Sequence, residues 1–274
     1  MMHLRDFTTL IPQPIRFELR RTFHRGTGTR CVLCGTEVRS FKDHGGGAEV
    51  LDRRRVVGGM RREADRCPVC HACDRTRMIM LYLEQFADLG GATRDILHVA
   101  PDLGLYLWLK RRPDISYTGS DIDAGRYRHI EQFREADLTA APFATGSFDL
   151  VICSHVMEHV PDDAAALREI FRILRPGGRA LLLVPFALDG DGTDEDPGLQ
   201  DPAERDRRFG QWDHVRLYDR ADFLDRMRQA GFTATLFEPF ETCRTEAERL
   251  HLNPLETLPV GCKPNPDGPD GGAR

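Results

Sequence analysis

Four cysteines form two CxxC pairs in the first third of the chain, and these are the residues best suited to bind a metal. Each CxxC turn presents two thiolates, and four thiolates together make a closed tetrahedral zinc site. In a chain without an export signal, clustered cysteines favour metal binding over disulfides. The predicted ligands of one structural Zn²⁺ are Cys31, Cys34, Cys67 and Cys70. His71 and Cys73 are alternative ligands, and a hairpin with free thiols is the other interpretation.

Polar residues directly follow several apolar runs that look like strands. In a doubly wound sheet, ligands bind just beyond the ends of the strands. Asp121 follows the run at 115–120, and its carboxylate could accept hydrogen bonds from two ribose hydroxyls. Asp137 lies in the segment Glu135–Leu138, which follows a further short strand between the runs at 115–120 and 148–154. Ser154 and His155 follow FDLVICS, residues 148–154.

These residues require an alternating series of strands and helices to position them, and the sequence has one. Short apolar runs predict strands at 95–100, 115–120, 148–154, 179–186 and 233–238. Amphipathic stretches predict helices at 76–89, 103–112, 126–133, 162–174 and 218–231. The pattern predicts an α/β fold, a doubly wound and mostly parallel sheet with helices on both faces. A small N-terminal zinc-ribbon module precedes it.

Three segments follow from this pattern. The N-terminal module, residues 1–75, is irregular and glycine-rich. Residues 76–240 form the predicted α/β domain. Residues 241–274 are expected to be an extension with a short helix and a disordered tail.

Composition narrows the class of protein. The longest apolar stretch, residues 180–188, contains Pro185 and is too short to span a bilayer. The N-terminus lacks the apolar core of a secretory signal, so we expect a cytoplasmic protein with no membrane partner. Residues 1–80 carry 16 basic and 9 acidic side chains, against 22 and 34 in the remainder. That asymmetry indicates two modules, of which the basic one could contact nucleic acid.

Three stretches resemble class I S-adenosylmethionine (SAM) methyltransferases with a type 11 methyltransferase domain. They are YTGSDID at 117–123, EADLTAAPFATGSFDLVICSHVMEHV at 135–160 and LREIFRILRPGGRALLLVPF at 167–186. The resemblance covers roughly residues 92–240. A bacterial zinc-knuckle group of these methyltransferases is also similar at CPVCHACDRTRMIMLYL, from Cys67, and at residues 209–232.

The resemblance implies a SAM cofactor and a set of binding residues. Asp121 would bind the ribose, Asp137 the adenine amino group, and Leu138 would lie beside the ring. Ser154 and His155 would lie near the methyl group. The implied cofactor-binding residues are Ala100, Pro101, Asp102, Gly104, Asp121, Ile122, Asp137, Leu138 and Ser154.

The loop after the first strand departs from the family pattern. His98 stands where an acid is usual, and Ala100 and Asp102 replace two glycines, so that only Gly104 remains. An alanine is tolerated there if its φ is negative. Asp102 is expected to meet the methionine amino group of SAM instead.

Two histidines are the predicted catalytic bases, because an imidazole titrates near working pH. His155 follows the strand at 148–154, and His214 follows a long loop at 187–213 that could form a lid. At least one of His214, Arg216 and Tyr218 is expected to contact substrate, near Trp212. No acidic triad for Mg²⁺ is evident.

The sequence thus predicts a SAM-dependent methyltransferase acting on a small molecule or sugar, O- or N-directed. The first alternative is an rRNA methyltransferase that uses the zinc module to bind RNA. The second is a non-catalytic binding protein with the SAM fold, which the altered glycine loop would favour.

Overall fold

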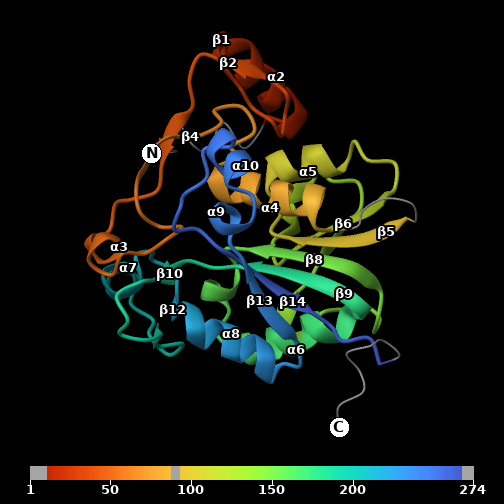
Figure 1. The fold of residues 1–274 in the computed structure, drawn as a ribbon, viewed down its shortest axis with the longest axis vertical. Coiled ribbons are helices and arrows are strands. Elements are labelled where there is room, and N and C mark those ends of the chain that lie inside the picture. The colour runs from red at the N-terminus through yellow and green to blue at the C-terminus, as the bar shows by residue number, and fades with distance from the viewer. Residues whose placement is uncertain (1–10, 88–92, 267–274) are drawn as a thin grey trace.

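A seven-stranded sheet forms the centre of the molecule, with the strand order β13-β14-β9-β8-β5-β6-β7 (Figure 1). The computed structural model describes residues 11–87 and 93–266. The strands are β5 (Arg94–Val99), β6 (Ile115–Asp121), β7 (Phe133–Glu135), β8 (Phe148–Ser154), β9 (Leu174–Leu183), β13 (Thr233–Phe237) and β14 (Leu258–Cys262). Strands β5 to β9 pair in parallel, whereas β14 runs antiparallel to both β9 and β13.

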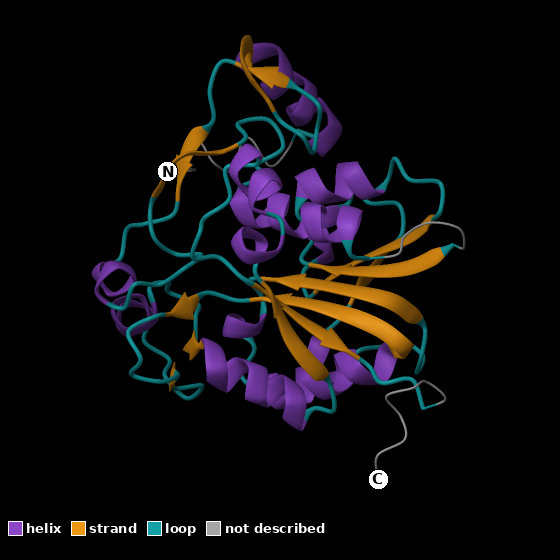
Figure 2. Ribbon diagram, in the orientation of Figure 1, coloured by secondary structure: helices purple, strands orange, loops and turns teal. Residues whose placement is uncertain are grey.

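Helices cover both faces of this sheet (Figure 2). One face carries α4 (Asp74–Gln85), α5 (Leu103–Leu109), α9 (Pro239–Thr242) and α10 (Arg244–Arg249). The other carries α6 (Asp163–Ile173) and α8 (Arg220–Gln229). The central strands are buried on both sides, as the apolar run of β8 with Val151 and Ile152 requires. The predicted doubly wound, mostly parallel α/β fold is confirmed.

The N-terminal module consists of short elements. They are α2 (Gln13–His24), β1 (Arg25–Arg30), β2 (Glu37–Val38), β3 (Lys42–His44), α3 (Glu49–Arg53) and β4 (Arg62–Arg66). Strand β1 pairs with β2, and β3 pairs with β4, both antiparallel.

The module shares a core with the α/β domain. Val69, Cys70 and Ala72 belong to the same buried cluster as Ile96 and Leu105. At the start of α5 the two parts are so close that a Cβ on Gly104 would lie 2.8 Å from the Ala72 Cβ. The CxxC turn with Cys67 and Cys70, one of two such knuckles, therefore packs against the start of α5.

Two predicted segments differ from the structure between 126 and 213. Residues 126–133 do not form a helix. A 3₁₀ turn, η1 (Ala124–Tyr127), is followed by irregular chain. Tyr127 and Ile130 are buried against Tyr106, so their helical spacing reflects packing of an irregular segment.

The loop at 187–213 contains β11 (Asp194–Glu195) and α7 (Pro202–Phe209). With β10 (Phe186–Ala187) and β12 (Arg216–Asp219), β11 forms a second small sheet.

The C-terminal segment also differs, because β14 belongs to the main sheet. Its sequence, LPVGC, has a proline and a glycine, which weaken a strand prediction. Pro259 is tolerated because only Val260, Gly261 and Cys262 pair with β9, and Pro259 lies beyond that ladder. The tail expected at the end of the chain lies outside the described residues from 267 onward. Among the described residues, no helix is long and apolar enough to cross a membrane.

Candidate functional site

A cavity of about 570 Å³ opens at the carboxyl ends of β5 and β6, and we call it the strand-end cavity. It is lined by Val99, Ala100, Asp121, Ile122, Ala136, Asp137, Leu138, Thr139, Val156, His159, Val160, Pro161, Asp162 and Ala165. Ala100, Asp121, Ile122, Asp137 and Leu138 are the predicted cofactor-binding residues among them. The structure therefore brings the predicted ribose and adenine contacts into one cavity.

Local turns hold Asp121 and Asp137, two of the three carboxylates that line this cavity. Asp121 ends β6 and accepts the backbone N–H of Asp123 at 2.9 Å. Asp137 caps a 3₁₀ turn, η2 (Leu138–Ala140), by accepting from the N–H and hydroxyl of Thr139 at 2.8 and 2.7 Å. Both contacts from Thr139 use Oδ1 of Asp137, which leaves Oδ2 for a ligand.

Four predicted cofactor residues do not line the strand-end cavity. They are Pro101, Asp102, Gly104 and Ser154. Asp102 caps α5, accepting the N–H of Gly104 at 2.9 Å, and also accepts the hydroxyl of Thr76 on α4 at 3.0 Å. Burial raises the pKa of this carboxyl. Its oxygens thus join two helices, and a contact with SAM stays a prediction.

Ala100 occupies the left-handed region, with φ of 47°. The expectation that an alanine here keeps a negative φ is therefore wrong. The chain turns at Ala100 as a glycine loop would. Left-handed backbone costs a non-glycine residue roughly 1–2 kcal/mol. Its N–H donates to the Ser120 carbonyl at 2.8 Å, so the turn is tied to β6.

A second, polar cavity of about 270 Å³ lies between the N-terminal module and the α/β domain. Its lining residues are His44, Gly45, Gly46, Leu51, Gly58, Gly59, Arg75, His155, Glu158, His159, Pro185, Phe209, Gly210, Gln211 and His214. Both predicted catalytic histidines, His155 and His214, are among them. His159 lines this cavity and the strand-end cavity, so the two adjoin.

A buried carboxylate controls the electrostatics of the polar cavity. Glu158, in the 3₁₀ turn η3 (Met157–His159), is fully buried, and its two oxygens accept no hydrogen bond from the described residues. Burial raises its pKa, but His155, with Nδ1 at 3.3 Å, outweighs burial and brings the pKa of Glu158 to about 2. Burial and Arg75 lower the pKa of His155 to about 4, and burial also lowers the pKa of His214. At neutral pH the carboxylate is ionised and these two imidazoles are neutral.

A buried arginine fixes the loop that carries Glu158. Arg216, on β12, is 1% exposed and donates to the carbonyls of Met157, Val160 and Pro161. Tyr218 donates to Asp163 at 2.7 Å. Hydrogen bonds within the fold occupy both groups. Of the three residues expected to include a substrate contact, His214 is the one that lines the polar cavity, and the contact stays a prediction.

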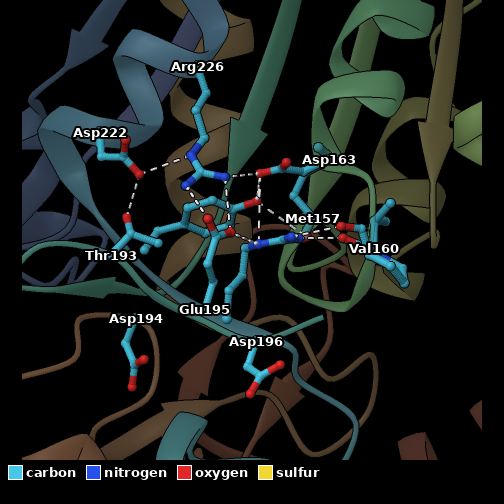
Figure 3. Close-up of polar contacts among 12 residues, drawn as sticks. Met157, Val160, Asp163, Thr193, Asp194, Glu195, Asp196, Asp222 and Arg226 are labelled. Atoms are coloured by element: carbon cyan, nitrogen blue, oxygen red, sulfur yellow. Dashed lines mark hydrogen bonds and ion pairs between the residues drawn. The ribbon is translucent and has the colours of Figure 1, made fainter. Parts of the chain in front are cut away.

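Further ion pairs support this arrangement (Figure 3). Arg226 on α8 reaches Asp163, Asp222 and Glu195 at 3.0, 2.9 and 2.9 Å. No pattern in the sequence separates these supporting arginines from the many exposed ones. Trp212 is 62% exposed and lies outside the polar cavity.

The four predicted metal-binding cysteines come together. Sγ atoms of Cys31 and Cys70 lie 3.6 Å apart, those of Cys34 and Cys67 4.0 Å apart, and all four lie within 4.8 Å of one another. Zinc–sulfur bonds of about 2.3 Å in a tetrahedron place the sulfurs roughly 3.8 Å apart, so the cluster fits Zn²⁺.

The two knuckles have the same turn, and neither alternative ligand joins the cluster. Gly35 N–H donates to the Cys31 carbonyl at 2.8 Å, and His71 N–H donates to the Cys67 carbonyl at 2.9 Å. His71 takes the position of Gly35, with a similar positive φ. Cys73 caps α4, with its sulfur 3.7 Å from the Thr76 hydroxyl.

Comparison with known proteins places the α/β domain in a family. The family model described as "Methyltransferase domain" matches residues 74–248, more than half of the chain. The ubiquinone biosynthesis O-methyltransferase of Psychrobacter arcticus is 31% identical over 202 residues, covering 63% of this chain and 68% of that protein. The ubiquinone/menaquinone biosynthesis C-methyltransferase of Dinoroseobacter shibae is 29% identical over 173 residues, covering 54% of this chain. The match spans 66% of the latter relative's length.

Among solved structures, the S-adenosylmethionine-dependent methyltransferase of Mesorhizobium loti is similar, with 19% identity and a TM-score of 0.43. The match covers 63% of this chain and 92% of that one. The family match confirms the methyltransferase domain that the sequence predicts. The chain belongs to the methyltransferase domain family.

Proposed function

We propose that the chain transfers a methyl group from SAM to a small acceptor bound in the polar cavity. The observation that carries this proposal is that the strand-end cavity and the polar cavity adjoin at His159. One cavity presents carboxylates for a nucleoside, and the other presents imidazoles for an acceptor. Methyl transfer requires that the cofactor and the nucleophile be held in line and that water be excluded. Two adjoining cavities, one for each reactant, suit this requirement.

The strand-end cavity suits the nucleoside half of SAM. Asp121 and the Oδ2 atom of Asp137 can accept hydrogen bonds from ribose hydroxyls and from the adenine amino group. Leu138 and Val160 supply apolar surface for the ring. When bound, SAM supplies a methyl group already activated on a sulfonium.

The polar cavity suits an acceptor whose oxygen or nitrogen must lose a proton. His155 is the favoured base, because its Nε2 accepts no hydrogen bond from the described residues and its Nδ1 lies against Glu158. A carboxylate behind an imidazole orients the ring and stabilises it when it takes up a proton. His214 is the second candidate, with Nδ1 3.3 Å from the Phe209 carbonyl.

A small acceptor is favoured over RNA by the position of the N-terminal module. Residues His44, Gly45 and Gly58 of this module wall the polar cavity, whose volume is near the lower end of small-molecule sites. The names of the two relatives describe ubiquinone and menaquinone biosynthesis, which also favours a small molecule.

We also propose that the four cysteines of the two knuckles bind one structural Zn²⁺. Four thiolates leave no open coordination position, so this ion stabilises the fold and does not take part in transfer. Because the segment with Cys67 and Cys70 packs against the start of α5, the ion would also stabilise the methyltransferase domain.

Radiolabelled SAM tests the small-acceptor proposal directly. The chain is incubated with labelled SAM and, separately, with a panel of phenols, sugars and amines or with ribosomal RNA. The proposal expects label in a small product, formed more slowly by about 10²–10⁴ in His155→Gln. Label found only in RNA would overturn the proposal.

A further inference from the structure

We propose that Glu158, His159 and His214 bind a divalent transition-metal ion at the junction of the two cavities. One potential ligand atom from each residue lies within 4.8 Å of the others. One carboxylate and two imidazoles form a ligand set that Zn²⁺ and Fe²⁺ both accept in proteins, with coordination positions left open. This site is separate from the four cysteines, and metal binding here does not depend on the proposed function.

The backbone holds the two ligand-bearing segments together. Val215 N–H donates to the Glu158 carbonyl at 3.0 Å, which sets His214 beside the η3 turn. The rings of His159 and His214 meet edge to face, with centroids 4.6 Å apart. Arg216 fixes the other side of the turn through the Met157 carbonyl. The ligand positions are therefore set by the fold.

Each histidine has an acceptor behind it, as metal-binding histidines usually do. His159 Nδ1 lies 3.4 Å from an Asp213 carboxylate oxygen. His214 Nδ1 lies 3.3 Å from the Phe209 carbonyl. Such acceptors fix the Nε2 lone pair of each ring for a metal.

The Glu158 side chain is the strongest evidence for a cation site here. It is 1% exposed, yet neither oxygen accepts a hydrogen bond from the described residues. A buried charge is costly unless it is paired or coordinates a metal. His155 Nδ1 lies 3.3 Å from Oε1, which leaves Oε2 for an ion.

The position of this ion suits the acceptor. The three ligands line the polar cavity, and His159 also lines the strand-end cavity. An acceptor oxygen on an open coordination position would have a lowered pKa beside the methyl group of SAM. The carboxyl-rich set that Mg²⁺ prefers is absent from this cluster, so a transition metal is the expected occupant.

Metal content measured after dialysis against Zn²⁺ tests the site. Wild type is expected to hold one ion per chain more than Glu158→Gln or His214→Asn, whatever the cysteines hold. Asp213→Asn is expected to weaken zinc binding about 10–100-fold. His44→Asn is the matched control, because His44 lines the same cavity outside the cluster.

Two further variants keep the result interpretable. If Glu158→Gln does not fold, His159→Asn, whose side chain is 30% exposed, must lose the same ion. Cys34→Ser is expected to lose the cysteine-bound ion and keep this one. Equal zinc content in wild type and in folded Glu158→Gln or His159→Asn would overturn the proposal.

Discussion

Gly58 of the N-terminal module packs directly against His155, the residue that we propose as the catalytic base. A Cβ added at Gly58 would lie 3.0 Å from Cε1 and 3.2 Å from Nε2 of His155. Arg75 strengthens this contact between the two parts of the chain by donating to the Gly58 carbonyl at 3.0 Å. The N-terminal module therefore forms part of the acceptor site as well as carrying the cysteines.

Gly58→Ala is expected to reduce methyl transfer at least tenfold while SAM affinity stays within about threefold. The added methyl group would displace the His155 ring, and Gly58 does not line the strand-end cavity. Gly47→Ala is the control, because Gly47 also has a positive φ but, beyond its two chain neighbours, no atom of the described residues lies within 4 Å of an added Cβ. Steady-state kinetics and calorimetry on both variants measure the effect. Equal losses in the two would attribute the change to backbone strain alone.

His155→Gln is expected to lower turnover by about 10²–10⁴, the usual contribution of a general base. Affinity for SAM should change little, since His155 lies outside the strand-end cavity. Single-turnover rates with an identified acceptor make the measurement. If both His155→Gln and His214→Gln keep near-normal rates, proximity alone drives transfer and no histidine serves as the base.

Cys67→Ser is expected to lose the cysteine-bound zinc and to destabilise the whole chain, not only residues 1–75. The reason is that Cys67 and Cys70 belong to the cluster that also contains Ile96 of the sheet. Zinc analysis and thermal unfolding should show metal loss together with one lower-temperature transition. Cys73→Ser, a buried cysteine outside the metal cluster, should keep its zinc.

His98 is expected to make the protein less stable in acid. Burial lowers its pKa to about 3, whereas the unfolded value is about 6.5. Between these two values the unfolded chain binds a proton that the folded chain does not. Stability therefore falls as pH drops, by up to about 1.4 kcal/mol per pH unit from this residue.

The structure explains why His98 stays neutral. Its Nε2 accepts the Asp102 N–H at 3.4 Å, and its Nδ1 contacts the Tyr117 hydroxyl at 3.1 Å. Urea denaturation from pH 7 to pH 4 should show a shallower pH slope in His98→Gln than in wild type. An unchanged slope would mean that His98 does not contribute to acid sensitivity.

The sequence predicts those features that depend on local chemistry and on periodicity. Continuous apolar runs identified β5, β6 and β8, and strand ends located Asp121 and Asp137. The spacing of the cysteines identified a cluster that the fold does assemble. These signals lie within a few residues of the feature that they predict.

Features that depend on distant contacts were not predictable in this way. β14 carries Pro259 and Gly261, and only its pairing with β9 and β13 makes it a strand. The wall that Gly58 forms over His155 joins residues almost a hundred positions apart. The structural role of Arg216 is also set by distant contacts, because the three carbonyls that accept its hydrogen bonds lie more than fifty positions earlier in the chain.

The central claim, that the strand-end cavity binds SAM, is tested most directly by calorimetric titration of SAM into wild type and Asp121→Ala. Removing a charged acceptor of one or two ribose hydrogen bonds should weaken binding by on the order of 2–4 kcal/mol. Asp123→Ala is the control, because this neighbouring carboxylate does not line the cavity. The account predicts strong loss of affinity in Asp121→Ala and near-wild-type affinity in Asp123→Ala. Unchanged affinity in Asp121→Ala, or no SAM binding by the wild type, would contradict it.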